Sequence, residues 1–210
     1  MSPCRAFAIS LAFLLAAQAH AVPIQLNETD FANATASLSV TTEDFEGFST
    51  GLYASPFTFS NGQMSSVSPL ITASSTFCDT GQCLLDSTAQ GTEEARVFSG
   101  FAADTDYWAT DLRFVSPADL FDVVVTGNSG VLNLNGVSLV TMANLGFVGF
   151  YDPLGLLSIS FTNLGTQGGL GNYSFDNIQT ASEVPEPATI LLLGAGLMGL
   201  SALRRRRISK

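Results

Sequence analysis

Short stretches in which apolar and polar residues alternate recur along this chain, and turn-forming residues separate them. The alternation is complete over residues 157–161, which read Leu-Ser-Ile-Ser-Phe. Successive side chains of a β-strand point to opposite faces of a sheet, so this pattern predicts half-buried strands. Asn-Gly pairs at 61–62 and 135–136 are strong signals for two-residue hairpin turns. The chain is therefore expected to fold mainly as β-sheet.

Helical periodicity never extends beyond two turns, and strong helix formers are scarce. About 160 residues is enough for one domain with a sizeable core. The sequence predicts an all-β fold without helices, an antiparallel β-sandwich of jelly-roll type over residues 22–183. Its strands are expected at 37–42, 57–60, 63–67, 70–74, 95–101, 108–115, 120–126, 131–134, 137–142, 146–151, 156–162 and 173–180.

Three details of this sandwich follow from the same pattern. Residues 120–142 are expected to form a three-stranded meander, and 108–115 a half-buried strand. Strict alternation would place Phe175 and Ile178 on opposite faces, so a bulge or a strand end is expected between them. The expected core is Phe114, Phe121, Val123, Val125, Leu132, Phe147, Ile159, Phe161, Phe175 and Ile178.

Residues 1–21 have the build of a secretory signal peptide. Arg5 supplies the positive start, residues 6–17 are apolar, and a small-x-small site predicts cleavage after Ala21, with a second frame after Ala19. A membrane-spanning helix is the weaker interpretation, because the apolar run is far shorter than a span. The mature protein is therefore expected to begin outside the inner membrane.

The other end of the chain, 184–210, has three zones. Two prolines make residues 185–187 an extended, exposed segment. Residues 188–203 carry no charge and would rise about 24 Å as a helix, which barely spans a hydrocarbon core of about 30 Å. Arginines are costly to move across a bilayer, so those at the end remain cytoplasmic and the body lies outside. The tripeptide is Pro185, Glu186 and Pro187, and the arginines are Arg204, Arg205, Arg206 and Arg207.

The order of these zones over residues 184–207 resembles the PEP-CTERM sorting signal of Gram-negative bacteria. The resemblance implies that an exosortase recognises the tripeptide and cleaves near it, in cells that make exopolysaccharide. The protein would then be a substrate of that enzyme, anchored with its body in the periplasm before release to the cell surface or extracellular matrix. An ordinary C-terminal membrane anchor is the alternative.

Composition excludes several kinds of chemistry for the mature body. The chain's one histidine is His20 and its one lysine is Lys210, so residues 22–183 contain neither. A nucleophile activated by imidazole, a histidine-ligated zinc site and a lysine Schiff base are therefore excluded. The body is expected not to be an enzyme.

Residues 22–183 hold seventeen acidic residues against Arg96 and Arg113, a formal charge of −15. Nucleic acid, which proteins bind by neutralising phosphates, is excluded as a partner. Such a surface suits cations or neutral, hydroxyl-rich ligands, and solubility alone explains it equally well.

Two cysteines remain after export, Cys78 and Cys83, with Gly81 between them. In an oxidising compartment this spacing predicts a disulfide-closed loop, worth about 2 kcal/mol in the chain-entropy model. Metal binding through two thiolates without histidine is the weaker alternative.

Segments 44–48, 146–150 and 175–178 resemble exported β-sandwiches related to carbohydrate-binding modules. In several of those families, acidic residues near the two termini hold a structural calcium. The resemblance implies calcium at Glu46 and Asp176, with Asp44 as a less certain ligand. Solvated strand ends, with Asp176 making local turn hydrogen bonds, are the alternative.

Tyr107 and Trp108 lie beside three aspartates, an arrangement in which an aromatic ring can stack on a sugar while carboxylates take its hydroxyls. Packing of Trp108 in the core is the alternative, and it is the more common role of such a ring. We expect a structural or adhesive protein of an exopolysaccharide matrix. A carbohydrate-binding module with a defined glycan and a carboxylate-dependent glycoside hydrolase are the rival functions.

Overall fold

The structure is a computed structural model that describes residues 22–66, 70–74, 78, 81–86, 95–113, 120–139, 145–164 and 173–183. The expected signal peptide and sorting signal lie outside these ranges. Within them, no helix has the length and apolar character needed to cross a membrane. The expected membrane helix at 188–203 falls on residues that are not described.

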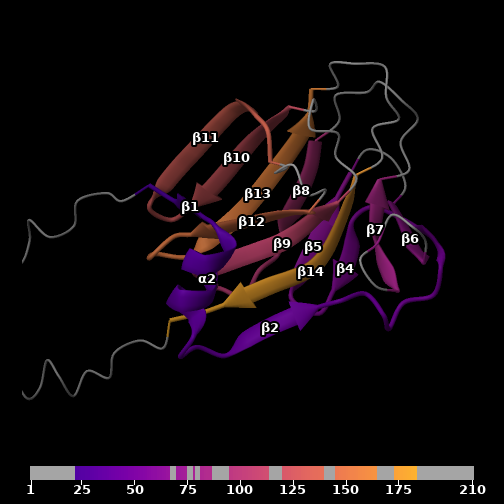
Figure 1. The fold of residues 1–210 in the computed structure, drawn as a ribbon, viewed down its shortest axis with the longest axis horizontal. Coiled ribbons are helices and arrows are strands. Elements are labelled where there is room, and N and C mark those ends of the chain that lie inside the picture. Colours follow the sequence, from indigo (N-terminus) through magenta and orange to yellow (C-terminus); the bar gives the residue numbers. More distant parts are fainter. Residues whose placement is uncertain are drawn as a thin grey trace, which may run out of the picture.

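The body consists of two antiparallel sheets packed face to face (Figure 1). The eight-stranded sheet has the order β1 (Ile24–Leu26), β12 (Leu145–Tyr151), β9 (Tyr107–Arg113), β14 (Ser174–Ala181), β7 (Gln82–Asp86), β6 (Leu70–Ser74) and β3 (Gly51–Tyr53), and β2 (Val40–Glu43) also pairs with β14. The six-stranded sheet has the order β11 (Gly130–Val137), β10 (Phe121–Gly127), β13 (Leu156–Asn163), β8 (Ala95–Ser99), β5 (Gly62–Ser65) and β4 (Phe57–Phe59). The predicted all-β, antiparallel, sandwich-like body is confirmed.

The main core lies between the sheets and is dominated by aromatic rings. Of the predicted core, Leu132 is only partly buried, Phe147 packs outside this core, and Phe114 lies outside the described residues. The other seven predicted side chains are buried. They are Phe121, Val123, Val125, Ile159, Phe161, Phe175 and Ile178.

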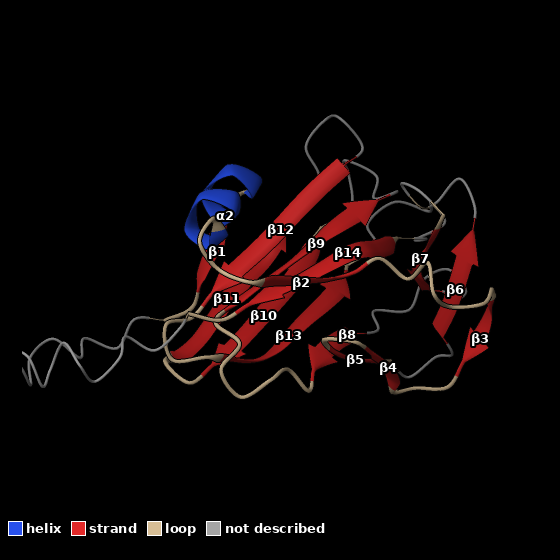
Figure 2. Ribbon diagram, turned by 90° about the horizontal axis from the view of Figure 1, so that it is seen from below, coloured by secondary structure: helices blue, strands red, loops and turns tan. Residues whose placement is uncertain are grey.

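A helix, α2 (Glu28–Thr35), covers the outer face of the eight-stranded sheet over β1, β9 and β12 (Figure 2). Asn27 caps it by accepting a hydrogen bond from the Asp30 N–H at 2.9 Å. Phe31 packs on Tyr107 and Ala109 and is 2% exposed. The expectation of no helices was therefore wrong, and so was that of a half-buried strand at 108–115, because α2 buries the second face of β9.

The predicted three-stranded meander over 120–142 was also wrong. The Asn-Gly pair at 135–136 lies inside β11 as a bulge, since Asn135 and Gly136 stand opposite Asp122 alone. Gly136 has a positive φ of 60°, and its N–H donates to Asp122 Oδ1 at 2.8 Å. Residues 138 and 139 are not in a strand, and 140–144 are not described.

The predicted irregularity in the last strand is a bulge at Asn177, which adopts φ 48°. The pairing of β14 with β9 shifts between Asp176 and Gln179. The bulge lies where β14 changes its second neighbour from β7 to β2. Both Phe175 and Ile178 consequently face the core, which strict alternation forbids.

Candidate functional site

Glu183 is the last described residue of the body and stands two positions before Pro185 in the sequence. Strand β14 ends at Ala181, whose carbonyl accepts a hydrogen bond from the Asp106 N–H at 3.1 Å. The Glu183 N–H donates in turn to Asp106 Oδ2 at 2.7 Å. These two bonds hold the backbone on both sides of Ser182 against the start of β9.

The side chain of Glu183 is held as well. The Tyr107 and Tyr151 hydroxyls both donate to Glu183 Oε1, at 2.9 and 3.1 Å. The two rings stack with their centroids 4.5 Å apart, across the pairing of β9 with β12. We call the set Asp106, Tyr107, Tyr151 and Glu183 the Glu183 clamp.

Burial and charge perturb the acid groups of the clamp. Burial raises the pKa of Asp106 above its ordinary 3.8, and the neighbouring Glu183, Asp104 and Asp152 carboxylates add to that rise. Burial and the bond to Glu183 raise the pKa of Tyr151 to about 12, and the pKa of Tyr107 rises for the same reasons. Both hydroxyls therefore keep their protons and remain donors at neutral pH.

Beside the clamp lies a groove of about 580 Å³, which we call the exit groove. Its walls come from the approach to β2, from β4 and its turn, from the loop between β8 and β9, and from the end of β14. About half of its lining residues carry hydroxyl or amide side chains, apolar atoms make up the larger share of its exposed surface, and the lining residues include no cationic side chain. The lining residues are Ser39, Thr41, Thr58, Phe59, Ser60, Asn61, Gly62, Gly100, Ala102, Asp104, Thr105, Thr180, Ala181, Ser182 and Glu183.

Side chains tie the two sheets together at this groove. Asn61 Nδ2, from the turn between β4 and β5, donates to the carbonyls of Thr41 and Ile178 at 3.2 and 3.0 Å. The Glu43 carboxylate accepts from the Ser60 N–H at 3.1 Å. The groove is therefore lined by backbone that both sheets hold in place.

The two predicted glycan-contact residues lie in the interior. Trp108 is fully buried among Phe98, Phe150 and Phe161, which is the core role that the sequence left open. Tyr107 is 6% exposed and its hydroxyl is bonded to Glu183. In this arrangement neither ring presents a face on which a sugar can stack.

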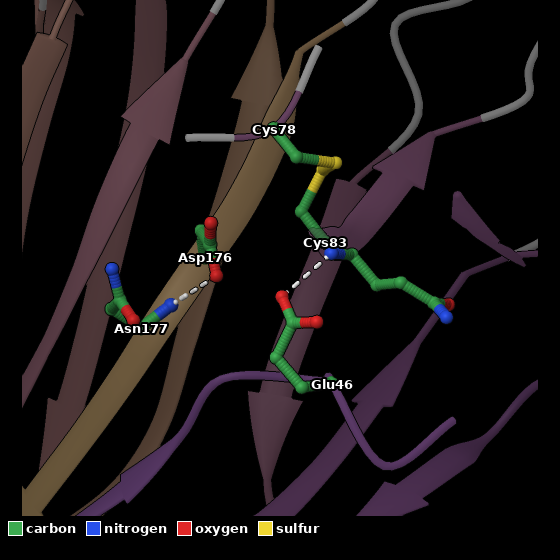
Figure 3. The surroundings of a disulfide bond; sticks show 6 residues. Glu46, Cys78, Cys83, Asp176 and Asn177 are labelled. Atoms are coloured by element: carbon green, nitrogen blue, oxygen red, sulfur yellow. Dashed lines mark hydrogen bonds between the residues drawn. A yellow bond between two sulfur atoms is a disulfide. The ribbon is translucent and has the colours of Figure 1, made fainter. Parts of the chain in front are cut away.

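The predicted disulfide is present and is buried between Cys78 and Cys83, whose Cα atoms are 5.4 Å apart. Glu46 lies against the loop that the disulfide closes (Figure 3). Glu46 Oε1 accepts from the Gln82 N–H at 2.8 Å, and a Cβ at Gly81 would collide with the same carboxylate. Glu46 thus caps the disulfide loop, a role that the sequence did not predict.

The predicted calcium ligands lie partly together. Figure 3 shows Glu46 and Asp176 beside the disulfide. Asp176 is buried, and its Oδ1 accepts from the Asn177 N–H at 2.8 Å, while Asp44 Oδ1 accepts from the Glu46 N–H at 3.1 Å. Among the described residues, no three acidic, histidine or cysteine side chains gather in a way that suits a metal ion. Calcium at Glu46 and Asp176 stays a prediction.

Carboxylates in this protein repeatedly hold backbone N–H groups. With so few cationic side chains in the body, an acidic group finds its hydrogen-bond partners on loops and turns, as at an N-cap or an Asx-turn. Sequence reasoning missed this role, because it depends on which loop lies beside each side chain. Carboxylates that accept from backbone N–H groups are those of Glu43, Asp44, Glu46, Asp106, Asp122, Asp152 and Asp176.

Comparison with solved structures gives weak likenesses to other β-sandwiches. A xylan-binding domain from CBM 22 has 10% identity and a TM-score of 0.37, over 68% of this chain and 93% of that chain. The K2 cleaved adhesin domain of Lys-gingipain has 14% identity and a TM-score of 0.42, over 68% and 99%. The family 11 carbohydrate-binding module of the cellulase Lic26A-Cel5E of Clostridium thermocellum has 15% identity and a TM-score of 0.37, over 71% of this chain and 98% of that chain. Nothing about ligands follows from such values.

No curated protein matches this chain in sequence. Residues 183–207, however, match the PEP-CTERM protein-sorting motif. The matched segment begins at Glu183, the residue that the clamp holds. The chain therefore carries a PEP-CTERM sorting signal, joined directly to the end of a β-sandwich-like body.

Proposed function

We propose that this protein is an exported, non-enzymatic component of the cell surface or extracellular matrix, with a structural or adhesive role linked to exopolysaccharide. An exosortase recognises residues 185–187 and cleaves near them. Until then the helix at 188–203 and the arginines at 204–207 anchor the chain, with the body in the periplasm. The observation that carries the proposal is the sorting motif at 183–207, directly after the last strand.

The Glu183 clamp supports this arrangement. Pro185 follows Glu183 by two residues, which extended chain spans in about 7 Å at most. The tripeptide therefore starts close to the surface of the folded body, and the clamp fixes its starting point. A sorting enzyme that takes up the tripeptide meets the body at the same time.

Side-chain chemistry supports a non-enzymatic role. Residues 22–183 lack histidine and lysine. The buried carboxylates that a hydrolase would need bind backbone instead, and Asp152, for example, accepts from the N–H groups of Ser129 and Leu154 at 3.1 and 2.9 Å. These bonds favour a loop-holding role over general acid or nucleophile chemistry.

Mass spectrometry of the mature protein from its native host tests the proposal, because it reports both termini at once. We expect a chain that starts at residue 22 and ends near the tripeptide. Replacing Pro185, Glu186 and Pro187 together by alanine should leave the tail uncleaved. A wild-type chain that still ends at Lys210 would contradict processing by an exosortase.

A further inference from the structure

We propose that the exit groove binds an uncharged, hydroxyl-rich ligand, namely a segment of a neutral polysaccharide. The proposal deepens the adhesive role proposed above and takes its extracellular setting from it. The volume of about 580 Å³ lies in the range of about 300–1,000 Å³ typical of small-ligand sites. It suits two or three sugar rings lying along the groove rather than a whole folded partner.

The hydrogen-bonding groups of the lining match a ligand that carries hydroxyl groups. Thr41, Thr58 and Ser60 are exposed members of the lining and offer hydroxyls that both donate and accept. Asp104 and Glu183 are exposed members as well and offer carboxylate acceptors. A ligand that has both donors and acceptors on every ring, as a sugar has, matches this set.

Charge excludes the main alternative ligands. The lining includes two carboxylates and no cationic side chain, so a phosphate or a uronate would be repelled. Phe59, the aromatic member of the lining, is only 7% exposed, so the groove offers little aromatic surface on which a peptide could anchor. Among the described residues no three acidic, histidine or cysteine side chains gather to suit a metal ion, so a neutral glycan is the ligand class that we favour.

The groove is also held in shape before any ligand arrives. Asn61 and Glu43 fix its floor to both sheets, and the clamp fixes Glu183 in its wall. A site that is already ordered loses less conformational entropy on binding. Because Glu183 belongs to both the groove and the start of the sorting motif, the glycan would be held next to the point where the anchor is attached.

Isothermal titration calorimetry on the full-length protein in detergent tests the proposal, with cellohexaose as the neutral probe and hexagalacturonate as its charged counterpart. We expect saturable binding of cellohexaose and none of hexagalacturonate. Ala102→Trp places a large ring in the groove from an exposed loop position and should abolish binding. Its melting curve shows whether the variant is folded.

A second variant removes hydroxyls without changing shape. Thr41→Val combined with Thr58→Val should weaken binding about tenfold. Thr126→Val is the matched control, because Thr126 lies on the outer face of the six-stranded sheet and is not among the residues that line the groove. If Thr126→Val weakens binding and the groove variants do not, the ligand lies on that face and the proposal is wrong.

Two further outcomes would overturn the groove proposal. One is the absence of binding to cellohexaose, and the other is tighter binding of an uncharged peptide of similar length that displaces cellohexaose from the wild type. Processing of the tail in the native host is scored separately in Ala102→Trp. Loss of glycan binding with normal processing contradicts only the groove, whereas an unprocessed wild-type tail contradicts only the sorting function.

Discussion

Tyr107 and Glu183 lie seventy-six residues apart in sequence, and the hydroxyl of one donates to the carboxylate of the other at 2.9 Å. The bond joins the first residue of β9 to the first residue of the matched sorting motif. Tyr151, from β12, makes a second bond to the same oxygen. The last described residue is therefore held in place by side chains, two positions beyond the last strand.

Removing these hydroxyls should loosen the exit of the chain. We expect Tyr107→Phe and Tyr151→Phe each to lower the free energy of unfolding by about 1 kcal/mol, because each removes one hydrogen bond to a charged group. Limited proteolysis should cut faster between residues 183 and 188 in the double variant. Tyr53→Phe is the control, since it also removes a hydroxyl bond, to the Ser49 carbonyl, but far from the exit. Equal cutting rates in all variants would contradict the clamp.

Stability should depend on pH through Asp106. Its pKa is raised above 3.8, so the folded body binds this proton more tightly than the unfolded chain does. The stability that it contributes is fully present below 3.8 and decreases as pH rises through the raised pKa. Asp106→Asn cannot titrate, yet its amide oxygen can still accept from the Glu183 N–H.

Urea unfolding from about pH 4 to about pH 7 measures this effect. We expect the variant to gain stability relative to the wild type as pH rises, because the wild-type carboxylate then becomes charged beside Glu183, Asp104 and Asp152. Stability curves that run parallel across this range would show that Asp106 does not titrate abnormally.

Sequence pattern predicted β10 and β13 together with their buried faces, but it placed Phe147 of β12 in the main core and ended a strand at the Asn-Gly pair inside β11. It missed β1 and β3, which have three residues each, β7, which has five, and α2, which has eight. Elements this short depend on their neighbours: α2 is stable because Phe31 fits on the outer face of β9 and β12.

Contacts between distant segments decided the other differences. The Asn-Gly pair at 135–136 is a hairpin signal, but β11 continues through it, because Asp122 on the neighbouring strand accepts from the Gly136 N–H. At the candidate site, sequence identified the sorting tripeptide from local chemistry. The clamp and the groove could not be predicted, since they join β2, β4, β9, β12 and β14.

Gly136 offers a direct test of the bulge. It has φ 60°, whereas Gly47 has no such constraint, and a Cβ would meet nothing within 4 Å at either position. Gly136→Ala should therefore cost about 1–2 kcal/mol through backbone strain alone. Gly47→Ala should be nearly neutral and serves as the matched control. Equal urea midpoints for the two variants would contradict a left-handed conformation at 136.

Substitutions at Glu46 distinguish the predicted calcium site from the loop-capping role. Glu46→Gln removes the charge but keeps an oxygen that can accept from the Gln82 N–H, whereas Glu46→Ala removes both. The capping role predicts that only the alanine variant loses stability, by about 1 kcal/mol. The calcium prediction states that adding calcium raises the melting temperature of the wild type, that EDTA lowers it, and that Glu46→Gln abolishes both shifts. A wild-type melting temperature that is the same in calcium and in EDTA would refute calcium binding at Glu46 and Asp176 and leave Glu46 as the cap of the disulfide loop.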